Sequence, residues 1–278
     1  MIARLLQRLA KAHFNYRNPL SLLAQRVTGR PVVTVADRET GLRFRCRHGA
    51  DRMLGEIFHS RIYDIPTAPV RRGDLVVDVG ANHGFTCCYF AQRGAQVVAF
   101  EPDPATYPFL TANIAANGLG DRIRAFPWAV AGSEGTARLN TADELGGGMS
   151  TFSDRFASAN RLAVTGMIQV RTETLPGIVA RLGIERIRLL KLDCEGSELD
   201  ILRSLDRATL EKIDSLAIEY HPDAYSLADL VDVVLGWTGF QVSKVVTQEV
   251  SNANLNVVSD RVMREWARGD RPESGCAN

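Results

Sequence analysis

The chain has 278 residues, of which 45% are hydrophobic, so it can bury a full core. This size predicts one large α/β domain with an appended lead-in segment. The 33 lysines and arginines almost balance the 32 aspartates and glutamates. This balance disfavours nucleic acid or an anionic membrane as the main partner and favours a small, roughly neutral substrate.

The cysteines and the apolar runs bear on the compartment. The five cysteines are odd in number and lack zinc-ligand spacing, which disfavours both a disulfide framework and a zinc site. No apolar run approaches the roughly 20 residues that span a bilayer, and the first residues lack the uncharged stretch of a secretory signal. We therefore expect a cytoplasmic protein without a transmembrane segment.

The N-terminal segment is basic, with no acidic residue before Asp37. Residues 1–14, MIARLLQRLAKAHF, place Leu5, Leu6 and Leu9 on one side of a predicted helix. We expect this helix to pack on the body of the protein. A peripheral contact with a membrane surface or a partner protein is the alternative.

The next segments predict strands and then an alternating α/β pattern. Residues 31–47 predict a β-hairpin, because two alternating apolar runs flank a polar turn at Gly41. From Leu75 onward, apolar strands alternate with helical stretches, which is typical of a mostly parallel sheet covered on both faces. We accordingly divide the chain into a lead-in at residues 1–69, an α/β domain at 70–262 and a polar tail at 263–278.

The sequence DVGANHG, residues 78–84, lies where a predicted strand turns into a helix, and α/β sheets bind ligands at such turns. Gly80 and Gly84 let the backbone approach a ligand closely, and the free amides of the helix face the same place. The GxxxG spacing differs from the GxGxxG of NAD enzymes. The next predicted strand ends in Glu101, which can accept two hydrogen bonds from ribose hydroxyls. The pattern therefore indicates a nucleoside site with little need to neutralise phosphate.

S-adenosylmethionine is the ligand that this pattern favours, because Asp78 places a negative charge near a cationic ligand. The simplest alternative is that Gly80 and Gly84 only form a tight turn while Asp78 caps the helix. An NAD-dependent oxidoreductase or epimerase is a competing function, opposed by the missing GxGxxG. A catalytically inactive Rossmann-like interaction module is the other.

A second acidic cluster follows two later strands. Asp193 and Glu195 follow one predicted strand, and Glu219 and His221 end the next. If these strands are neighbours, the four residues converge where a methyl acceptor must lie. Methyl transfer to a hydroxyl needs an aligned oxygen and removal of its proton. His221 is the predicted general base because its ordinary pKa lies near working pH, and Asp193 or Glu195 could take that role if burial raised its pKa.

The remaining predictions for this cluster concern a metal ion, Glu198 and Lys191. Three carboxylates with a histidine could hold a divalent cation, but no metal is predicted. Glu198 is expected only to favour the first turn of a helix. Lys191 is expected to pair with a carboxylate and to have no catalytic role.

Together, the strings DVGANHG, FEPDP, WAVAGSEGTARL and LLKLDCEGSELDIL resemble the FkbM-type class I methyltransferases over residues 70–222. The resemblance implies that residues 70–262 form a Rossmann-like methyltransferase domain, a doubly wound, mostly parallel seven-stranded sheet with helices on both faces. It also implies S-adenosylmethionine as cofactor and O-methylation of a hydroxyl on a sugar or natural product. The cofactor-binding residues that it implies are Asp78, Gly80, Ala81, Asn82, Gly84, Glu101, Pro102, Trp128, Ala129 and Asp193.

Acceptor choice is expected to lie outside these motifs, in the lead-in and in the segment at residues 140–167. That segment has three consecutive glycines and is too long for an idle connection, so it is predicted to be a substrate-covering loop. The predicted partner is a small-molecule acceptor, a sugar or glycosylated metabolite, and not nucleic acid. The oligomeric state and the identity of the acceptor stay open.

Overall fold

The computed structural model describes residues 16–47, 49–142, 150–153, 157–158, 164–247 and 253–268. The basic helix predicted at residues 1–14 lies outside them. The central sheet consists of β3 (Leu75–Val79), β4 (Gln96–Phe100), β5 (Ile123–Phe126), β9 (Leu189–Leu192), β10 (Ser215–Tyr220), β11 (Phe240–Thr247) and β12 (Ala253–Ser259).

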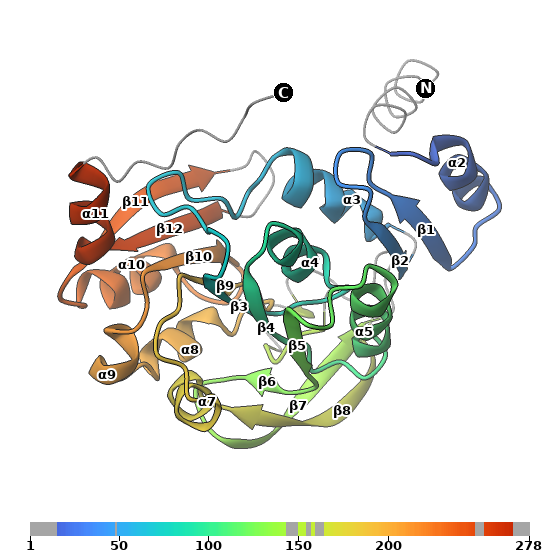
Figure 1. Ribbon diagram of the computed structural model, residues 1–278. Coiled ribbons are helices and arrows are strands. Elements are labelled where there is room, and N and C mark those ends of the chain that lie inside the picture. The colour runs from blue at the N-terminus through green and yellow to red at the C-terminus, as the bar shows by residue number, and fades with distance from the viewer. Residues whose placement is uncertain are drawn as a thin grey trace.

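The sheet has the order β11-β12-β10-β9-β3-β4-β5 (Figure 1). The strands from β10 to β5 are paired in parallel, whereas β12 runs antiparallel to both of its neighbours. This arrangement confirms the predicted doubly wound, mostly parallel sheet of seven strands. The strand order reverses at β3, where the chain adds β4 and β5 on one side and later β9 and β10 on the other. A ligand crevice is expected at the carboxyl ends of the strands at such a point.

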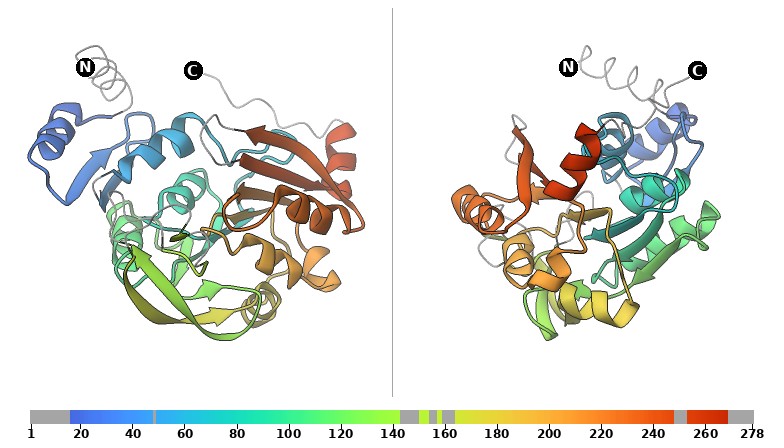
Figure 2. Two further views of the ribbon diagram at one scale, coloured as in Figure 1. Left: turned by 180° about the vertical axis from the view of Figure 1, so that it is seen from behind. Right: turned by 60° about the vertical axis from the view of Figure 1, so that its left-hand side comes forward.

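Helices cover both faces of the sheet (Figure 2). One face carries α3 (Asp51–Leu54), the short π-helix η1 (Gly55–His59), α4 (Phe85–Gln92), α5 (Tyr107–Ala116) and α11 (Asp260–Ala267). The other carries α7 (Leu175–Leu182), α8 (Glu198–Arg203), α9 (Arg207–Leu210) and α10 (Leu227–Leu235).

Successive strand residues alternate between two hydrophobic cores. In β3 and β4, Val76 and Val97 belong to the core beneath α4 and α5, whereas Val77 and Val98 belong to the core beneath α7 and α10. Both faces of each strand must therefore be apolar, which explains the nearly continuous hydrophobic runs in the sequence.

A smaller sheet lies below the central one in Figure 1. It contains β6 (Ala129–Val130), β7 (Gly135–Ala142) and β8 (Val164–Glu173), with β8 in the middle. Both ends of the predicted loop at 140–167 are thus strand, and Thr151 forms a further bridge with Asn140. The loop is shorter than the sequence indicated because its flanks pair as a hairpin.

The lead-in contains α2 (Pro19–Val27) and the antiparallel strands β1 (Val32–Ala36) and β2 (Arg43–Arg47), which confirms the predicted hairpin. Two asparagines near the end of α5 pair with the backbone of β2. Asn113 accepts from the amide of Arg45 at 2.8 Å and donates to its carbonyl at 3.0 Å. Asn117 makes the same pair of bonds with Arg43, each at 2.8 Å. These side chains cover an edge that would otherwise expose unpaired backbone groups.

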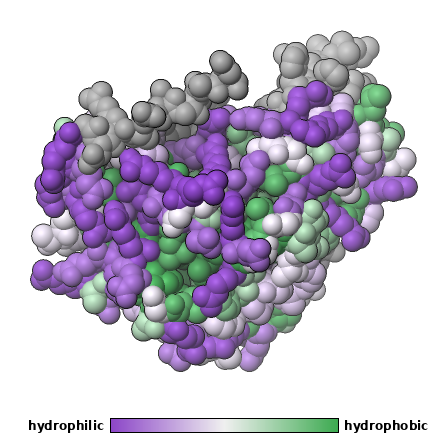
Figure 3. All heavy atoms as spheres, in the orientation of Figure 1, coloured by the Kyte–Doolittle hydropathy of each residue, from purple (hydrophilic) through white to green (hydrophobic). Residues whose placement is uncertain are grey.

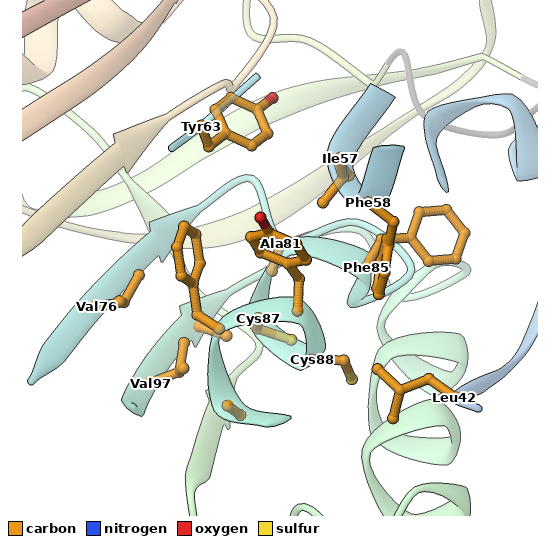
Figure 4. Close-up of a cluster of buried hydrophobic side chains, with 14 of the residues drawn as sticks. Leu42, Ile57, Phe58, Tyr63, Val76, Ala81, Phe85, Cys87, Cys88 and Val97 are labelled. Atoms are coloured by element: carbon orange, nitrogen blue, oxygen red, sulfur yellow. The ribbon is translucent and has the colours of Figure 1, made fainter. Parts of the chain in front are cut away.

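Aromatic packing joins the lead-in to the α/β domain. The ring of Phe44 lies edge-on to the rings of Phe58 and Phe85, at centroid distances of 5.7 and 5.1 Å. Figure 4 shows this cluster, in which η1 and the segment after it pack against α4. The lead-in and the domain therefore share one core.

The remaining sequence predictions concern the tail, the cysteines and the surface. Residues 263–267 of the predicted tail belong to α11, and residues 269–278 lie outside the described part of the chain. Four cysteines are described, all of them free thiols. No helix among the described residues is long and apolar enough to cross a membrane. The face in Figure 3 is mainly hydrophilic, with hydrophobic residues gathered near its middle.

Candidate functional site

A cleft lies at the carboxyl ends of β3, β4 and β9, as expected for this topology. It encloses about 630 Å³ free of protein atoms, with the open solvent at its mouth included. The residues that line it are Met53, Val79, Gly80, Asn82, Phe100, Glu101, Pro102, Asp103, Thr106, Trp128, Ala129, Val130, Leu139, Ser150, Phe152, Asp193, Cys194 and Glu195.

The bend after β3 brings two strand ends into close contact. Gly80 has a φ of +74°, and a Cβ there would lie 1.8 Å from the carbonyl oxygen of Asp193. Only glycine fits this position, since any side chain would separate β3 from β9. Gly84 is the N-cap residue just before α4 and has a left-handed conformation, and Ala81 is buried. Neither Ala81 nor Gly84 lines the cleft, so their predicted contacts with a cofactor remain predictions.

Glu101 is held at the end of β4 by backbone amides. Its Oε2 accepts from the amide of Asn82 at 2.8 Å, and its Oε1 accepts from the amide of Asp103 at 2.9 Å. Burial raises the pKa of Glu101 to about 7 despite these two bonds. The carboxylate is thus fixed in position, and each oxygen keeps a lone pair for a ligand hydroxyl.

Asp78 lies within β3. Its side chain is fully buried and does not line the cleft, so its predicted contact with the cofactor remains a prediction. Lys191, its register partner on β9, lies opposite it, with Nζ 3.2 Å from Oδ1 of Asp78 and 3.4 Å from Oδ2 of Asp193. Nζ also donates to the carbonyl of Gly80 at 2.7 Å. Lys191 therefore pairs with carboxylates as predicted, and Asp78 supports the bend from inside.

The end of the cleft beside β6 is aromatic. Trp128 and Phe126 have ring centroids 4.6 Å apart, and the guanidinium of Arg171 lies 4.4 Å from the Trp128 ring centre. Trp128, Ala129 and Pro102 all line the cleft, as the resemblance implied for cofactor-binding residues. Such a surface suits a flat aromatic ligand group.

The acidic cluster occupies the opposite end of the cleft. The Nε2 atom of His221 lies 3.4 Å from Oε2 of Glu195 and 3.9 Å from Oδ1 of Asp193. Its Nδ1 atom lies 3.1 Å from Oε1 of Glu198. The structure therefore brings together the four predicted residues, since Glu219 joins Asp193 through a shared hydroxyl contact from Tyr63.

The carboxylates around His221 favour its protonated form. Burial by itself lowers the pKa of His221, but Glu198, followed by Glu195 and Asp193, outweighs it and raises the pKa to about 10. A general base needs the neutral imidazole, so these charges work against the role of His221 as base, which remains a prediction. Burial raises the pKa of Glu195 to about 8, which places that carboxyl nearer the range that a base needs.

Glu198 is more than the first residue of a helix. Its Oε1 accepts from the amide of Cys194 at 2.8 Å, and its Oε2 accepts from the amide of Gly196 at 3.1 Å and from the hydroxyl of Tyr225 at 3.0 Å. Although burial opposes ionisation, His221 and then the amide of Cys194 lower the pKa of Glu198 to about 2. Glu198 thus fixes the loop that carries Glu195.

Two cleft residues adopt a left-handed backbone conformation without being glycine. Asn82 has a φ of 51° and Glu195 a φ of 55°. Such backbone is uncommon outside glycine; asparagine tolerates it, whereas for glutamate it is costly and is often found at functional sites. Hydrogen bonds to Glu101 and Glu198 hold the two loops in place, so the strain is supported by the site itself.

A cation site is geometrically conceivable at the cluster. Ligand atoms of Asp193, Glu219 and His221 lie within 4.8 Å of one another. Tyr63 and Lys191 already bind Asp193, and His221 carries a positive charge. The cluster thus has its own compensating cations.

The segment between β7 and β8 reaches the cleft. Ser150 donates to Oδ2 of Asp103 at 3.3 Å, and the hydroxyl of Thr151 donates to the carbonyl of Glu195 at 2.5 Å. Ser150 and Phe152 line the cleft. The sequence did not predict these contacts or those of Tyr63, because neither segment carries a recognisable motif. That the segment covers a substrate stays a prediction.

Comparison with known proteins places the chain among methyltransferases. Residues 78–242 match a family model described as "Methyltransferase FkbM domain". Methyltransferase sdnD of Sordaria araneosa is 28% identical over 243 residues, which cover 78% of this chain and 92% of that protein. The 31-O-demethyl-FK506 methyltransferase FkbM of Streptomyces tacrolimicus is 30% identical over 215 residues, or 69% and 82% of the two chains. The 2-O-methyltransferase NoeI of Sinorhizobium fredii (strain NBRC 101917 / NGR234) is 26% identical over 156 residues, or 52% and 63%.

Proposed function

The chain belongs to the FkbM methyltransferase family, and we propose that it transfers the methyl group of S-adenosylmethionine to a hydroxyl of a sugar or natural-product small molecule. Glu101 is the observation that carries this proposal. Its carboxylate lies at the end of β4 in the cleft, held by two backbone amides, in the position from which a carboxylate can bind both ribose hydroxyls.

The two ends of the cleft support the same ligand. Trp128 and Phe100 offer an aromatic surface for adenine, and the carboxylate of Asp193 places negative charge at the other end. A sulfonium cation is attracted to that charge, whereas a pyrophosphate would be repelled by it. Family membership likewise decides against the NAD-dependent oxidoreductase that the sequence left as an alternative.

The acidic cluster supports O-methylation. When bound, S-adenosylmethionine would supply an electrophilic methyl carbon for the acceptor oxygen, with S-adenosylhomocysteine as the leaving group. In this proposal Glu195 accepts the hydroxyl proton, since its pKa of about 8 leaves a fraction ionised at neutral pH and a proton on it is tolerated. His221 stays protonated and holds the carboxylates in place. Two of the related proteins are named for O-methyl groups, which favours the same acceptor atom.

Calorimetric titration and a methylation panel test the proposal together. The protein should bind S-adenosylhomocysteine and not NAD. With S-adenosylmethionine it should add one methyl group to at least one member of a panel of hydroxylated sugars and natural products, as detected by mass spectrometry. Binding of NAD alone would overturn the proposal. Cofactor binding without methylation of any member would instead favour the inactive module.

A further inference from the structure

We propose that Tyr63, in the lead-in outside the family match, is a positioning residue of the methyl-transfer site. Its hydroxyl fixes the carboxylate of Asp193 and connects it to Glu219. This inference rests on the proposed function, because it assigns Tyr63 a role in aligning the acceptor beside the same carboxylates.

The contacts of Tyr63 fix one oxygen of Asp193. The hydroxyl donates to Oδ2 of Asp193 at 2.9 Å, and Nζ of Lys191 lies 3.4 Å from the same oxygen. Lys191 also sits over the ring of Tyr63, with Nζ 5.5 Å from its centre. Oδ2 is therefore bound from two sides, which leaves Oδ1 for His221 and for an acceptor hydroxyl.

The second contact makes Tyr63 a link between two strands. The same hydroxyl lies 3.3 Å from Oε2 of Glu219, so it connects the end of β9 with the end of β10. Two neighbouring carboxylates repel each other, and a shared donor lowers that cost. Burial, followed by the charges of Asp193 and Glu219, raises the pKa of Tyr63 well above its usual value. The hydroxyl therefore stays a neutral donor.

The lead-in holds Tyr63 rigidly. Its side chain is only 4% exposed and belongs to the core that Figure 4 shows, together with Ile57 and Phe58 of η1. The next residue, Asp64, accepts from the hydroxyl of Tyr89 at 2.8 Å and pairs with Arg93 at 3.2 Å. Because the backbone is anchored on both sides of Tyr63, its side chain can hold a carboxylate within the narrow range of positions that displacement chemistry requires.

Tyr63→Phe tests the proposal, and Tyr107→Phe is its matched control. Both substitutions remove a tyrosine hydroxyl that donates a hydrogen bond inside the protein, but the hydroxyl of Tyr107 donates to the carbonyl of Ala125 and not to the acidic cluster. We expect Tyr63→Phe to lower kcat by about tenfold or more, because hydrogen bonds to charged groups contribute at least that much. The affinity for S-adenosylhomocysteine should change by less than about threefold. Tyr107→Phe should keep kcat near the parent value.

Unchanged kcat in Tyr63→Phe, or an equal fall in both variants, would overturn the proposal. A second measurement needs no acceptor and so separates this inference from the proposed function. In crystal structures of the free protein, the carboxylate of Asp193 should leave its position in Tyr63→Phe and keep it in the control variant, since only the first substitution removes a donor to Asp193. An unmoved carboxylate in Tyr63→Phe would also overturn the role of Tyr63. Failure of the parent protein to methylate any acceptor would count only against the proposed function.

Discussion

The two ends of the cleft hold their carboxylates by different means. Glu101 is held by two neutral backbone amides, and its raised pKa comes mainly from burial. At the other end, Glu195, Glu198 and His221 hold one another, so the pKa of each depends on the charges of the rest. A change at the first end should therefore act locally, whereas a change in the cluster should spread to its neighbours.

The largest expected effect concerns the bend that joins the two ends. Gly80→Ala would place a Cβ 1.8 Å from the carbonyl oxygen of Asp193, so β3 and β9 would have to separate. We expect the free energy of unfolding to fall by about 3 kcal/mol or more and cofactor binding to be lost, as measured by denaturant titration and calorimetry. Gly118→Ala is the control, because Gly118 has a similar φ of +65° but open space around it. Equal losses in the two variants would show that backbone strain, and not the clash, is responsible.

Loss of the imidazolium is expected to come next. His221→Ala leaves the fully buried Glu198 without its main positive partner, which should cost about 3 kcal/mol of stability by thermal or chemical unfolding. Turnover should fall more than cofactor affinity does, since Glu195 and Asp193 lose a shared contact. Normal turnover in this variant would contradict the cluster as described.

Glu101→Ala should affect only the cofactor end. We expect the binding free energy of S-adenosylhomocysteine to weaken by about 1.5 to 3 kcal/mol, because the substitution removes the charged group that would accept hydrogen bonds from two hydroxyls. Calorimetry can measure this, with Glu134→Ala as a control at an exposed position of the chain. Unchanged affinity in Glu101→Ala would remove this residue from the cofactor site.

The same carboxyl predicts a pH dependence. With a pKa of about 7 in the free protein, Glu101 becomes protonated as the pH falls and loses its charge as a hydrogen-bond acceptor. Affinity for S-adenosylhomocysteine should therefore be highest above pH 8 and should fall by up to roughly tenfold per pH unit below 7. In Glu101→Gln this dependence should disappear. If that variant keeps the pH dependence, another group causes it.

The smallest expected effect is that of a chelator. Lys191 and the protonated His221 already supply positive charge to the acidic cluster, so dialysis against a chelator should leave turnover unchanged. Loss of turnover that added Mg²⁺ or Mn²⁺ restores would show instead that Asp193 and Glu219 bind a cation during the reaction.

The same contrast explains what the sequence could predict. Gly80 and Glu101 lie at strand ends within short contiguous motifs, so the local pattern was sufficient to predict that both line one cleft. Asp78 carries the right charge in the same motif, yet it pairs in register with Lys191 and is fully buried. Register between distant strands is set by the folded sheet and cannot be read from seven residues.

The acidic cluster depended even more on the fold. The sequence correctly predicted that Asp193 and His221 lie close together. The protonation state of His221, however, depends on Glu198, whose side chain turns back from its helix. Tyr63 lies 130 positions before Asp193 and has no motif. Acceptor choice is still expected in the lead-in and in the loop between β7 and β8, and the cytoplasmic location stays a prediction.

A crystal structure of the complex with S-adenosylhomocysteine tests the central claim most directly. Both ribose hydroxyls should lie within hydrogen-bonding distance of Glu101, with adenine beside Trp128 and the sulfur directed toward Asp193 and Glu195. A ribose that contacts neither oxygen of Glu101, or a ligand bound elsewhere on the molecule, would contradict the account.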